Sequence, residues 1–212
     1  MRHIMVLNAK GGSGKTTIAT NLASYYASME KKVVLADYDP QGSSLSWLQA
    51  RSAGRPPIEA IAAFEKNAAR PKRNTDIVIM DAPAAVHGAE LTKMVRKAET
   101  IIIPVLPSPI DMRAAAQFIK EISNSAPVAQ KKAKLGLVAN RSRDYTNVYW
   151  ELDDFLARQR APFLTMLRDS QNYVRAAERG IGIFEMGPAA TAVDRGQWDP
   201  LLKWLKSKRS QV

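Results

Sequence analysis

The sequence of 212 residues contains no cysteine. This absence excludes disulfide bonds, thiol catalysis and any iron–sulfur or zinc site held by cysteine. Histidine is scarce too, and neither His3 nor His87 has another metal ligand at a useful spacing. No apolar run approaches the ~20 residues of a membrane span, and residues 1–8 are too short a stretch for a signal peptide. We therefore expect a soluble protein, compatible with a cytoplasmic setting.

Acidic residues are in the minority. The chain has 20 Asp and Glu residues against 31 Lys and Arg residues, which gives a formal net charge of +11 spread along its whole length. Such an excess favours an anionic partner, either nucleic acid or an acidic membrane face. The alternative is a basic surface that only keeps the protein in solution.

Apolar runs bounded by turn residues recur along the chain and alternate with helical patterns. At 46% hydrophobic residues and this length, one domain spanning residues 1–212 is expected. Runs such as Ile77–Met80 and Ile101–Ile103 are typical of buried parallel strands. The pattern predicts an α/β fold, with a mostly parallel central sheet flanked by helices on both faces. The predicted strands are 3–8, 33–37, 76–81, 100–105, 134–140 and 163–167.

Helical patterns fill most of the intervals between these strands. The segment 51–57 is the best loop candidate, and Asp199 with Pro200 favours a helix start near the end of the chain. The predicted helices are 16–30, 43–50, 58–69, 89–97, 111–125, 146–158, 171–179 and 200–208.

A glycine-rich segment, residues 9–17, stands directly between the first predicted strand and the first predicted helix. This is the context that a phosphate-binding P-loop requires, because glycines let several backbone N–H groups converge on one phosphate at a helix N-terminus. Lys15 would neutralise the β- and γ-phosphates, and the Thr16 hydroxyl would bind Mg²⁺. The predicted nucleotide-binding residues here are Gly11, Gly12, Ser13, Gly14, Lys15, Thr16 and Thr17.

The ordinary P-loop pattern begins with glycine, but Ala9 occupies that position and Lys10 follows it. With this pair the segment resembles the deviant Walker A motif of the ParA/MinD family of P-loop ATPases. The resemblance implies ATP and Mg²⁺ as ligands. It also implies that Lys10 acts catalytically from the partner subunit, by reaching across a dimer to the other nucleotide.

Two carboxylate segments stand at the ends of predicted strands, where nucleotide switches are found. The segment 37–42 resembles the first switch of the family, which implies that Asp39 orients the attacking water and that Asp37 supports the magnesium shell. The segment 81–83 resembles the Walker B and second-switch region, with Asp81 holding magnesium through water. Many relatives carry a hydroxyl residue where Ala82 stands. An ordinary Asp-Pro turn is the alternative reading of residues 37–42.

The segment 136–141 ends another predicted strand and resembles the adenine-side segment of the family. This implies that Asn140, with Arg141 beside it, contacts the base. A strand-ending asparagine is equally typical of a turn or a helix cap, so both interpretations stay open.

The resemblance covers nearly the whole chain and is strongest to the short ParA group, which includes ParF-like and McdA-like proteins. It implies an ATP sandwich dimer of two copies of the chain that binds nucleoid DNA without sequence preference. An adaptor of the ParB/McdB type would then stimulate hydrolysis and release the dimer, which positions or segregates a cargo such as a plasmid, a chromosome or a carboxysome.

Basic residues in the last quarter of the chain stand near positions that DNA-binding relatives use. Non-specific binding needs only phosphate neutralisation, so scattered cations on one face suffice, although each is equally typical of a solvated surface. The candidate DNA contacts are Arg168, Arg175, Arg195, Lys203 and Lys206, with Lys208 and Arg209 after them.

A MinD-like membrane-associated ATPase is the competing interpretation. Trp198, Leu201, Leu202 and Leu205 share one helical face with basic residues after them, as in a lipid-binding helix. A last helix packed on the domain needs the same stripe, and this packing is favoured over a membrane partner. A P-loop metabolic kinase would not need Lys10, and Asp39 argues against a scaffold that binds ATP without hydrolysing it.

Overall fold

The computed structural model describes residues 1–143 and 147–212. Its centre is a sheet of seven strands in the order β3-β2-β4-β1-β5-β6-β7, and every neighbouring pair is parallel. The α/β fold expected from the sequence is therefore confirmed. The strands are β1 Arg2–Val6, β2 Val33–Asp37, β3 Ile58–Ala62, β4 Ile77–Asp81, β5 Thr100–Val105, β6 Lys134–Ser142 and β7 Phe163–Arg168.

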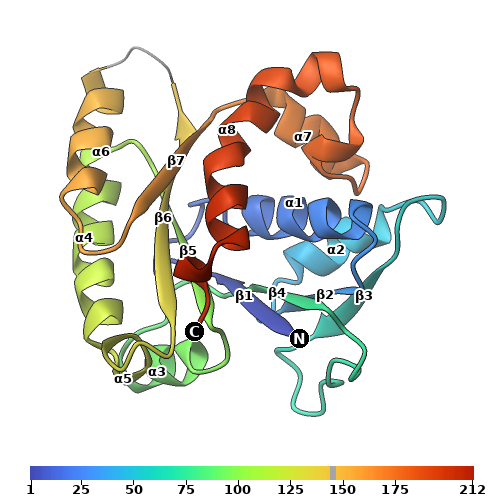
Figure 1. Cartoon of the computed structure of the whole chain (residues 1–212), viewed down its shortest axis with the longest axis horizontal. Coiled ribbons are helices and arrows are strands. Elements are labelled where there is room, and N and C mark those ends of the chain that lie inside the picture. Colours follow the sequence, from blue (N-terminus) through green and yellow to red (C-terminus); the bar gives the residue numbers. More distant parts are fainter. Residues whose placement is uncertain (144–146) are drawn as a thin grey trace.

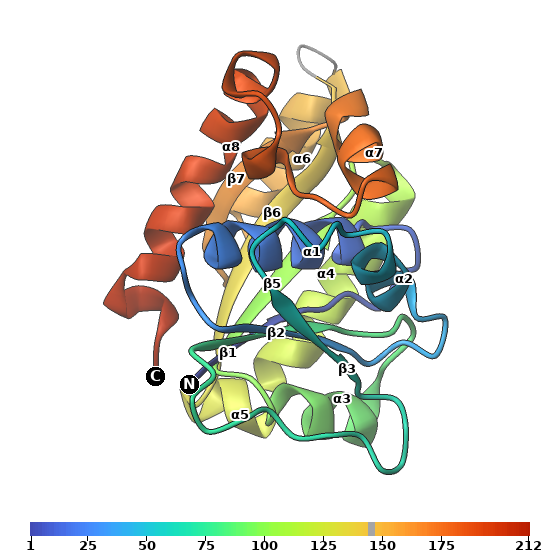
Figure 2. The ribbon, with the colours of Figure 1, turned by 90° about the vertical axis from the view of Figure 1, so that its right-hand side faces the viewer.

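Helices cover both faces of this sheet (Figures 1 and 2). One face carries α1 Lys15–Ser28, α2 Ser43–Gln49, α7 Gln171–Glu178 and α8 Pro188–Lys206, and the other carries α3 Gly88–Val95, α4 Pro109–Asn124 and α6 Asn147–Ala157. Alternate strand residues separate the two cores: Ile4 and Val6 pack towards α1 and α8, whereas Met5 packs towards α3, α4 and α6. Shorter elements are α5 Ala126–Ala129, η1 Ile183–Glu185 and η2 Lys208–Ser210.

The segment 58–69 was expected to be a helix, and this prediction is wrong. Its first part is the edge strand β3, which pairs with β2 from Ile58 to Ala62, and the rest is a loop. The alanines of this segment favour a helix locally, but pairing with β2 satisfies its backbone and buries Ile61 in the core.

The last helix begins at Pro188, not at Asp199. Pro200 lies inside it, where the lost backbone N–H is tolerated because Asp194 and Trp198, in the preceding turns, are fixed in the core. The helix predicted over 146–158 begins at Asn147, and residue 146 itself lies outside the described residues.

The sheet reverses its strand order beside β1. From β1 the chain crosses through α1 to β2 on one side, and β5, β6 and β7 lie on the other side. In parallel sheets the crevice at such a reversal, at the carboxyl ends of the strands, is where ligands bind. The glycine-rich segment follows β1 at this point.

Candidate functional site

The glycine-rich segment forms a tight loop between β1 and α1. Gly12 and Gly14 have φ angles of 75° and 88°, in the left-handed region that favours glycine. A Cβ atom on Gly14 would lie 2.0 Å from Nδ2 of Asn140, so a side chain there would also clash. Gly14 is the N-cap of α1 and offers no side-chain cap, and the first turn of α1 contains no acidic residue. The N–H groups of this turn are therefore available to an anion.

A cavity of about 310 Å³ opens beside this loop. It brings together the predicted P-loop, the end of β2, the end of β4 and the end of β6, as the crevice geometry requires. Its lining residues are Gly11, Gly12, Gly14, Lys15, Thr16, Thr17, Asp39, Gln41, Ser43, Ala82, Ala84 and Arg141.

Lys15 is buried in this cavity, with its Nζ 3.4 Å from the Lys10 carbonyl oxygen. Burial lowers the pKa of Lys15, and the carboxylates of Asp81 and Asp39 oppose that shift. Lys15 thus lies near two carboxylates, in a loop that presents N–H groups, and this arrangement suits a polyphosphate.

Asp81 is the buried carboxylate at the end of β4. Its Oδ2 accepts a hydrogen bond of 2.7 Å from the Thr16 hydroxyl, and its Oδ1 has no hydrogen-bond partner among the described residues. Burial raises the pKa of Asp81 to about 7, although the hydrogen bond from Thr16 opposes the shift. A buried carboxylate with a free oxygen beside a threonine hydroxyl fits Mg²⁺, which is held by few protein groups together with substrate phosphates. The described residues contain no cluster of three or more His, Cys, Asp and Glu side chains that could hold a metal by themselves.

Asp37 is fully buried opposite Asp81 in the β2–β4 pairing. Its carboxylate accepts backbone N–H groups from Asp39 at 3.0 Å, Ser44 at 3.1 Å and Leu45 at 3.3 Å. These bonds tie the turn and the start of α2 to β2. The structure therefore shows a positioning role for Asp37, and its place in a magnesium shell stays a prediction.

Asp39 is only partly buried and lines the cavity. Its Oδ1 accepts the Gln41 N–H at 3.0 Å, and its carbonyl accepts the Gly42 N–H at 2.9 Å. This turn fixes the aspartate at the mouth of the cavity, where a carboxylate can meet a water next to a bound phosphate.

Lys10 does not line this cavity. Its Nζ forms an ion pair of 2.5 Å with Asp111 at the start of α4, and the side chain is 40% exposed. Asp111 also accepts from the Ser108 hydroxyl and is the acid of the helix N-terminus there. Burial would raise the pKa of Asp111, but hydrogen bonds from Lys10 and Ser108 hold it below its ordinary value. Sequence reasoning missed Asp111, although the run Ser108–Asp111 reads as a helix start.

Asn140 is buried at the end of β6 and donates from Nδ2 to the Ser13 carbonyl at 2.8 Å. It thus ties the glycine-rich loop to β6, and its contact with a base stays a prediction. Arg141 is exposed, lines the cavity and has a φ of 53°. A non-glycine residue in this region is strained, and such strain clusters at functional sites.

The predicted DNA contacts divide into two kinds, and Lys208 and Arg209 belong to the exposed kind. Arg168 bonds to the buried carboxylate of Asp194 at 2.7 Å, and Arg195 donates to the carbonyls of Phe184 and Met186 at 3.1 and 2.7 Å. These two guanidinium groups hold the C-terminal elements together. Arg175, Lys203 and Lys206 are exposed.

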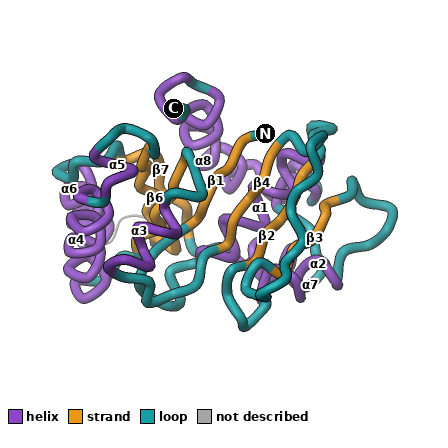
Figure 3. The backbone as a smooth tube through the Cα atoms, turned by 90° about the horizontal axis from the view of Figure 1, so that it is seen from below, coloured by secondary structure: helices purple, strands orange, loops and turns teal. Residues whose placement is uncertain are grey.

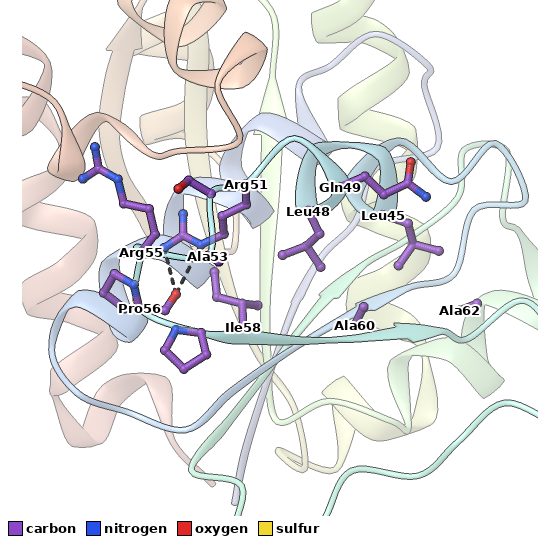
Figure 4. A pocket seen from close by; sticks show the side chains of 12 residues that line it. Leu45, Leu48, Gln49, Arg51, Ala53, Arg55, Pro56, Ile58, Ala60 and Ala62 are labelled. Carbon is purple, nitrogen blue, oxygen red and sulfur yellow. Dashed lines mark hydrogen bonds between the residues drawn. The ribbon is translucent and has the colours of Figure 1, made fainter.

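A larger cleft of about 610 Å³ lies between α2 and the edge strand β3 (Figure 4). Leu45 and Leu48 face Ile58 and Ala60 across it. The charge of Arg51 is neutralised there, because its guanidinium pairs with Glu185 at 2.7 Å and donates to the Pro56 carbonyl. Among the described residues, the charged side chains that line this cleft are Arg51 and Arg55. The smaller cavity is the candidate site because it combines Lys15 and Asp39 with the glycine-rich loop.

Residues 4–183 match the model of the CobQ/CobB/MinD/ParA nucleotide binding domain. The chain belongs to this family. The glycine-rich loop, Asp39 and Asp81 all fall within the matched range. As a CobQ/CobB/MinD/ParA domain, the chain is expected to place a nucleotide on the loop at residues 9–17.

Several relatives of the chain are proteins of carboxysome distribution or chromosome partitioning. The chain is 30% identical over 190 residues to the maintenance of carboxysome distribution protein A of Halothiobacillus neapolitanus, and 87% of each sequence is covered. Over 52 residues, which are 24% of the chain, it is 52% identical to the chromosome-partitioning ATPase Soj of Thermus thermophilus.

Solved structures agree with the family fold. Apo McdA of Cyanothece superposes with a TM-score of 0.70 at 15% identity, covering 96% of this chain and 98% of that one. Cobyrinic acid a,c-diamide synthase of Mycobacterium smegmatis, solved with an ATP analogue and magnesium, gives a TM-score of 0.72 at 21% identity and covers 100% of this chain and 98% of that one. The family and the fold expected from the sequence are both confirmed.

Proposed function

We propose that the chain is an ATPase that positions or partitions an intracellular cargo by switching between a monomer and an ATP-bound dimer on nucleoid DNA. The observation that carries this proposal is the placement of its two P-loop lysines. Lys15 lies inside the nucleotide cavity, whereas Lys10 points out of it to Asp111. A lysine outside its own cavity is available to a nucleotide held by a second copy of the chain.

ATP would lie along the glycine-rich loop, with its phosphates on the N–H groups at the start of α1 and on Lys15. Thr16 and Asp81 would hold Mg²⁺, which supplies charge neutralisation on the β- and γ-phosphates. Asp39, fixed by its turn, would orient the attacking water. In the dimer Lys10 would leave Asp111 and approach the other nucleotide, where it stabilises charge on the transferred phosphate.

The membrane-bound alternative gains no support from the last helix. Trp198, Leu201 and Leu205 are fully buried and Leu202 is 5% exposed, so this stripe packs on α1 and the sheet. Within residues 1–143 and 147–212, no helix has the length and apolar character needed to cross a bilayer.

DNA is the partner that we propose for the dimer. Non-specific binding grows with the number of phosphates contacted, so two copies of one basic face bind much more tightly than one. Arg175, Lys203 and Lys206 supply exposed cations for this face. A small adaptor of the ParB/McdB type would end the bound state by stimulating hydrolysis.

A mobility-shift assay with duplex DNA of unrelated sequences tests the proposal. The wild type should shift DNA with ATP and not with ADP. The double variant Lys203→Glu, Lys206→Glu should weaken the shift on every sequence while its basal ATPase rate stays unchanged.

A second measurement separates the ATPase from a scaffold that only binds ATP. Asp39→Ala should still bind ATP and shift DNA, while phosphate release falls to background, because only the water-orienting carboxylate is lost. Wild-type turnover in this variant would remove Asp39 from the mechanism. Sedimentation of the ATP-bound protein with anionic vesicles, without any DNA shift, would favour the membrane alternative.

A further inference from the structure

β6 and β7 lie side by side, with α5 near them (Figure 3). Residues at the amino ends of these two strands line a cavity at the opposite end of the sheet from the glycine-rich loop. Its volume is about 490 Å³. Parallel strands place their amino ends together at one edge, so this cavity is separated from the glycine-rich loop by the length of the strands.

Four cations from separate segments line this cavity. They are Lys131 after α5, Lys134 at the start of β6, Arg160 before β7 and Arg209 in η2. No carboxylate lines the cavity, and none of these four side chains forms an ion pair with a described carboxylate. Glu99 is attached to this region through its carbonyl, which accepts the Lys134 N–H, but its carboxylate pairs with Arg2.

The floor of the cavity is apolar and recessed. Leu135 is 7% exposed and Trp204 is 9% exposed, and Phe163 and Leu164 are partly buried beside them. A Cβ atom on Gly136 would lie 2.5 Å from Leu164 and 3.1 Å from Trp204, so the glycine lets both side chains settle onto β6. Leu135 and Phe163 pack with the core on the α4 face of the sheet, and Leu164 and Trp204 pack with the core on the α8 face, so the apolar lining spans both faces at the amino ends of the strands.

The backbone that carries two of these cations is constrained. Lys131 has a φ of 59°, a left-handed conformation that is usual for glycine at the end of a helix. Arg209 belongs to a short turn whose next residue, Ser210, accepts the Thr100 hydroxyl at 2.6 Å and a guanidinium N–H of Arg2 at 2.7 Å. Lys131 is thus held in a strained conformation, and Arg209 lies on a turn that is anchored by hydrogen bonds. Both features indicate a site where the positive charges have fixed positions.

The cavity continues into a second one of about 460 Å³, because Ser123 and Arg160 line both. The second cavity adds Lys120, an exposed cation on α4. A ligand that follows both would be extended in shape and would pass beside Arg160.

We infer that this joined surface binds an extended acidic peptide segment of a partner protein, with one bulky apolar side chain of the peptide in the pocket above Trp204. Charge complementarity selects an anionic ligand. The recessed floor selects a side chain that can enter it, as an anchor residue does at a binding hot spot.

The same geometry disfavours two other anions. Duplex DNA offers phosphates on a convex surface and has no group to fill an apolar recess. A membrane surface is bound by apolar side chains that project outwards, whereas Trp204 is buried and Phe163 is partly buried.

Fluorescence anisotropy tests this inference with a labelled peptide that carries one phenylalanine between glutamate and aspartate residues. The full-length wild type should bind it. The double variant Lys134→Glu, Arg160→Glu should bind about tenfold more weakly or worse. The control variant Lys31→Glu, Lys66→Glu has the same net charge but changes exposed residues outside both cavities, and should bind as the wild type does.

A second peptide, with serine in place of phenylalanine, separates anchoring from charge attraction and should bind more weakly at the same salt concentration. ADP should leave peptide binding unchanged, since the two sites lie at opposite ends of the sheet. Equal loss in the pocket and control variants, equal affinity for both peptides, or competition by ADP would each overturn the inference. Duplex DNA or phosphatidylglycerol vesicles whose binding is lost only in the pocket variant would overturn it as well.

Discussion

Both ends of the sheet carry cations, but the two ends differ in whether carboxylates lie beside those cations. At the carboxyl end, Lys15 lies near Asp81 and Asp39, and Lys10 pairs with Asp111. At the amino end, Lys131, Lys134, Arg160 and Arg209 have no such carboxylate partners among the described residues. Because the lysines at the carboxyl end already have carboxylates beside them, a bound anion can draw them away from those carboxylates, as a switch requires. Unbalanced charges create a steady attraction for anions.

Removing Lys15 should produce the largest effect at either end. Lys15→Ala removes the only lysine among the described residues that lines the nucleotide cavity, so ATP affinity measured by calorimetry should fall by more than about 100-fold. Lys31→Ala, at an exposed position after α1, is the control and should bind ATP normally. Unchanged affinity in Lys15→Ala would remove the P-loop assignment.

Lys10 and Asp111 distinguish the lysine itself from its ion pair. Lys10→Ala should remain monomeric with ATP in sedimentation experiments, because no cation reaches the partner's nucleotide. Asp111→Asn keeps the lysine and weakens only the pair that holds it, so this variant should still dimerise with ATP. Normal dimers of Lys10→Ala would contradict the proposed action across the dimer.

The ion pair between Arg168 and Asp194 should matter for stability more than for DNA. Burial raises the pKa of Asp194, but hydrogen bonds from Arg168 and Asn172 outweigh it and lower the pKa below its ordinary value. An acid with a lowered folded pKa stabilises the protein above the unfolded pKa of about 4 and loses that contribution as the pH falls through the folded value. Asp194→Asn should lower the free energy of unfolding by about 2–4 kcal/mol at neutral pH, since the ion pair between Arg168 and the buried carboxylate is lost.

Denaturation across pH checks this expectation, and the difference between wild type and Asp194→Asn should shrink below about pH 4. Arg168→Ala should be destabilised similarly. A loss of DNA binding in that variant would then need the exposed Lys206→Glu variant as a comparison before it could be assigned to a DNA contact.

The smallest effect should come from Lys131, where charge and conformation are in conflict. Lys131→Gly relieves the strain of the left-handed backbone and should raise the free energy of unfolding by up to about 1 kcal/mol. The same change should weaken binding of the acidic peptide, because it removes one of the four cations. Lys132 has no positive φ, so Lys132→Gly should destabilise the protein instead. Urea titrations of the two variants give the comparison, and destabilisation in both would show that the lysine conformation stores no strain.

The sequence predicted the sheet well where its signal is a continuous apolar run. Ile77–Met80 and Ile101–Ile103 became central strands because burial on both faces demands such residues. Ile58–Ala62 was mistaken for helix because an edge strand of small residues carries little of this signal, and its pairing with β2 depends on a distant segment. Pro200 likewise led to a predicted helix start that is too late in the chain. Packing around Trp198 outweighs the local cost of a proline inside α8.

At the candidate site the sequence predicted the residues of the P-loop and of three later strand ends, but not the contacts that folding makes between them. The P-loop is a local motif, so its glycines and Lys15 are readable from spacing alone. The contact of Asn140 with Ser13 and that of Lys10 with Asp111 span 127 and about 100 positions, respectively, and depend on how β1, β5 and β6 align. The cavity at the amino end was missed for the same reason, because its four cations come from four separate segments.

The central place of β1 also shapes how the chain folds as it is synthesised. This strand pairs with β4 from Arg2 to Val6 and with β5 from Ile4 to Val6, and it pairs with no strand made earlier than residue 77. On the ribosome β1 therefore has no strand to pair with until Ile77–Asp81 has emerged. The glycine-rich loop that follows β1 gains a strand on its other side only when Thr100–Val105 has been synthesised. Roughly half of the chain must be translated before the glycine-rich loop is held in place to bind a nucleotide. During that interval the apolar β1 is exposed to chaperones.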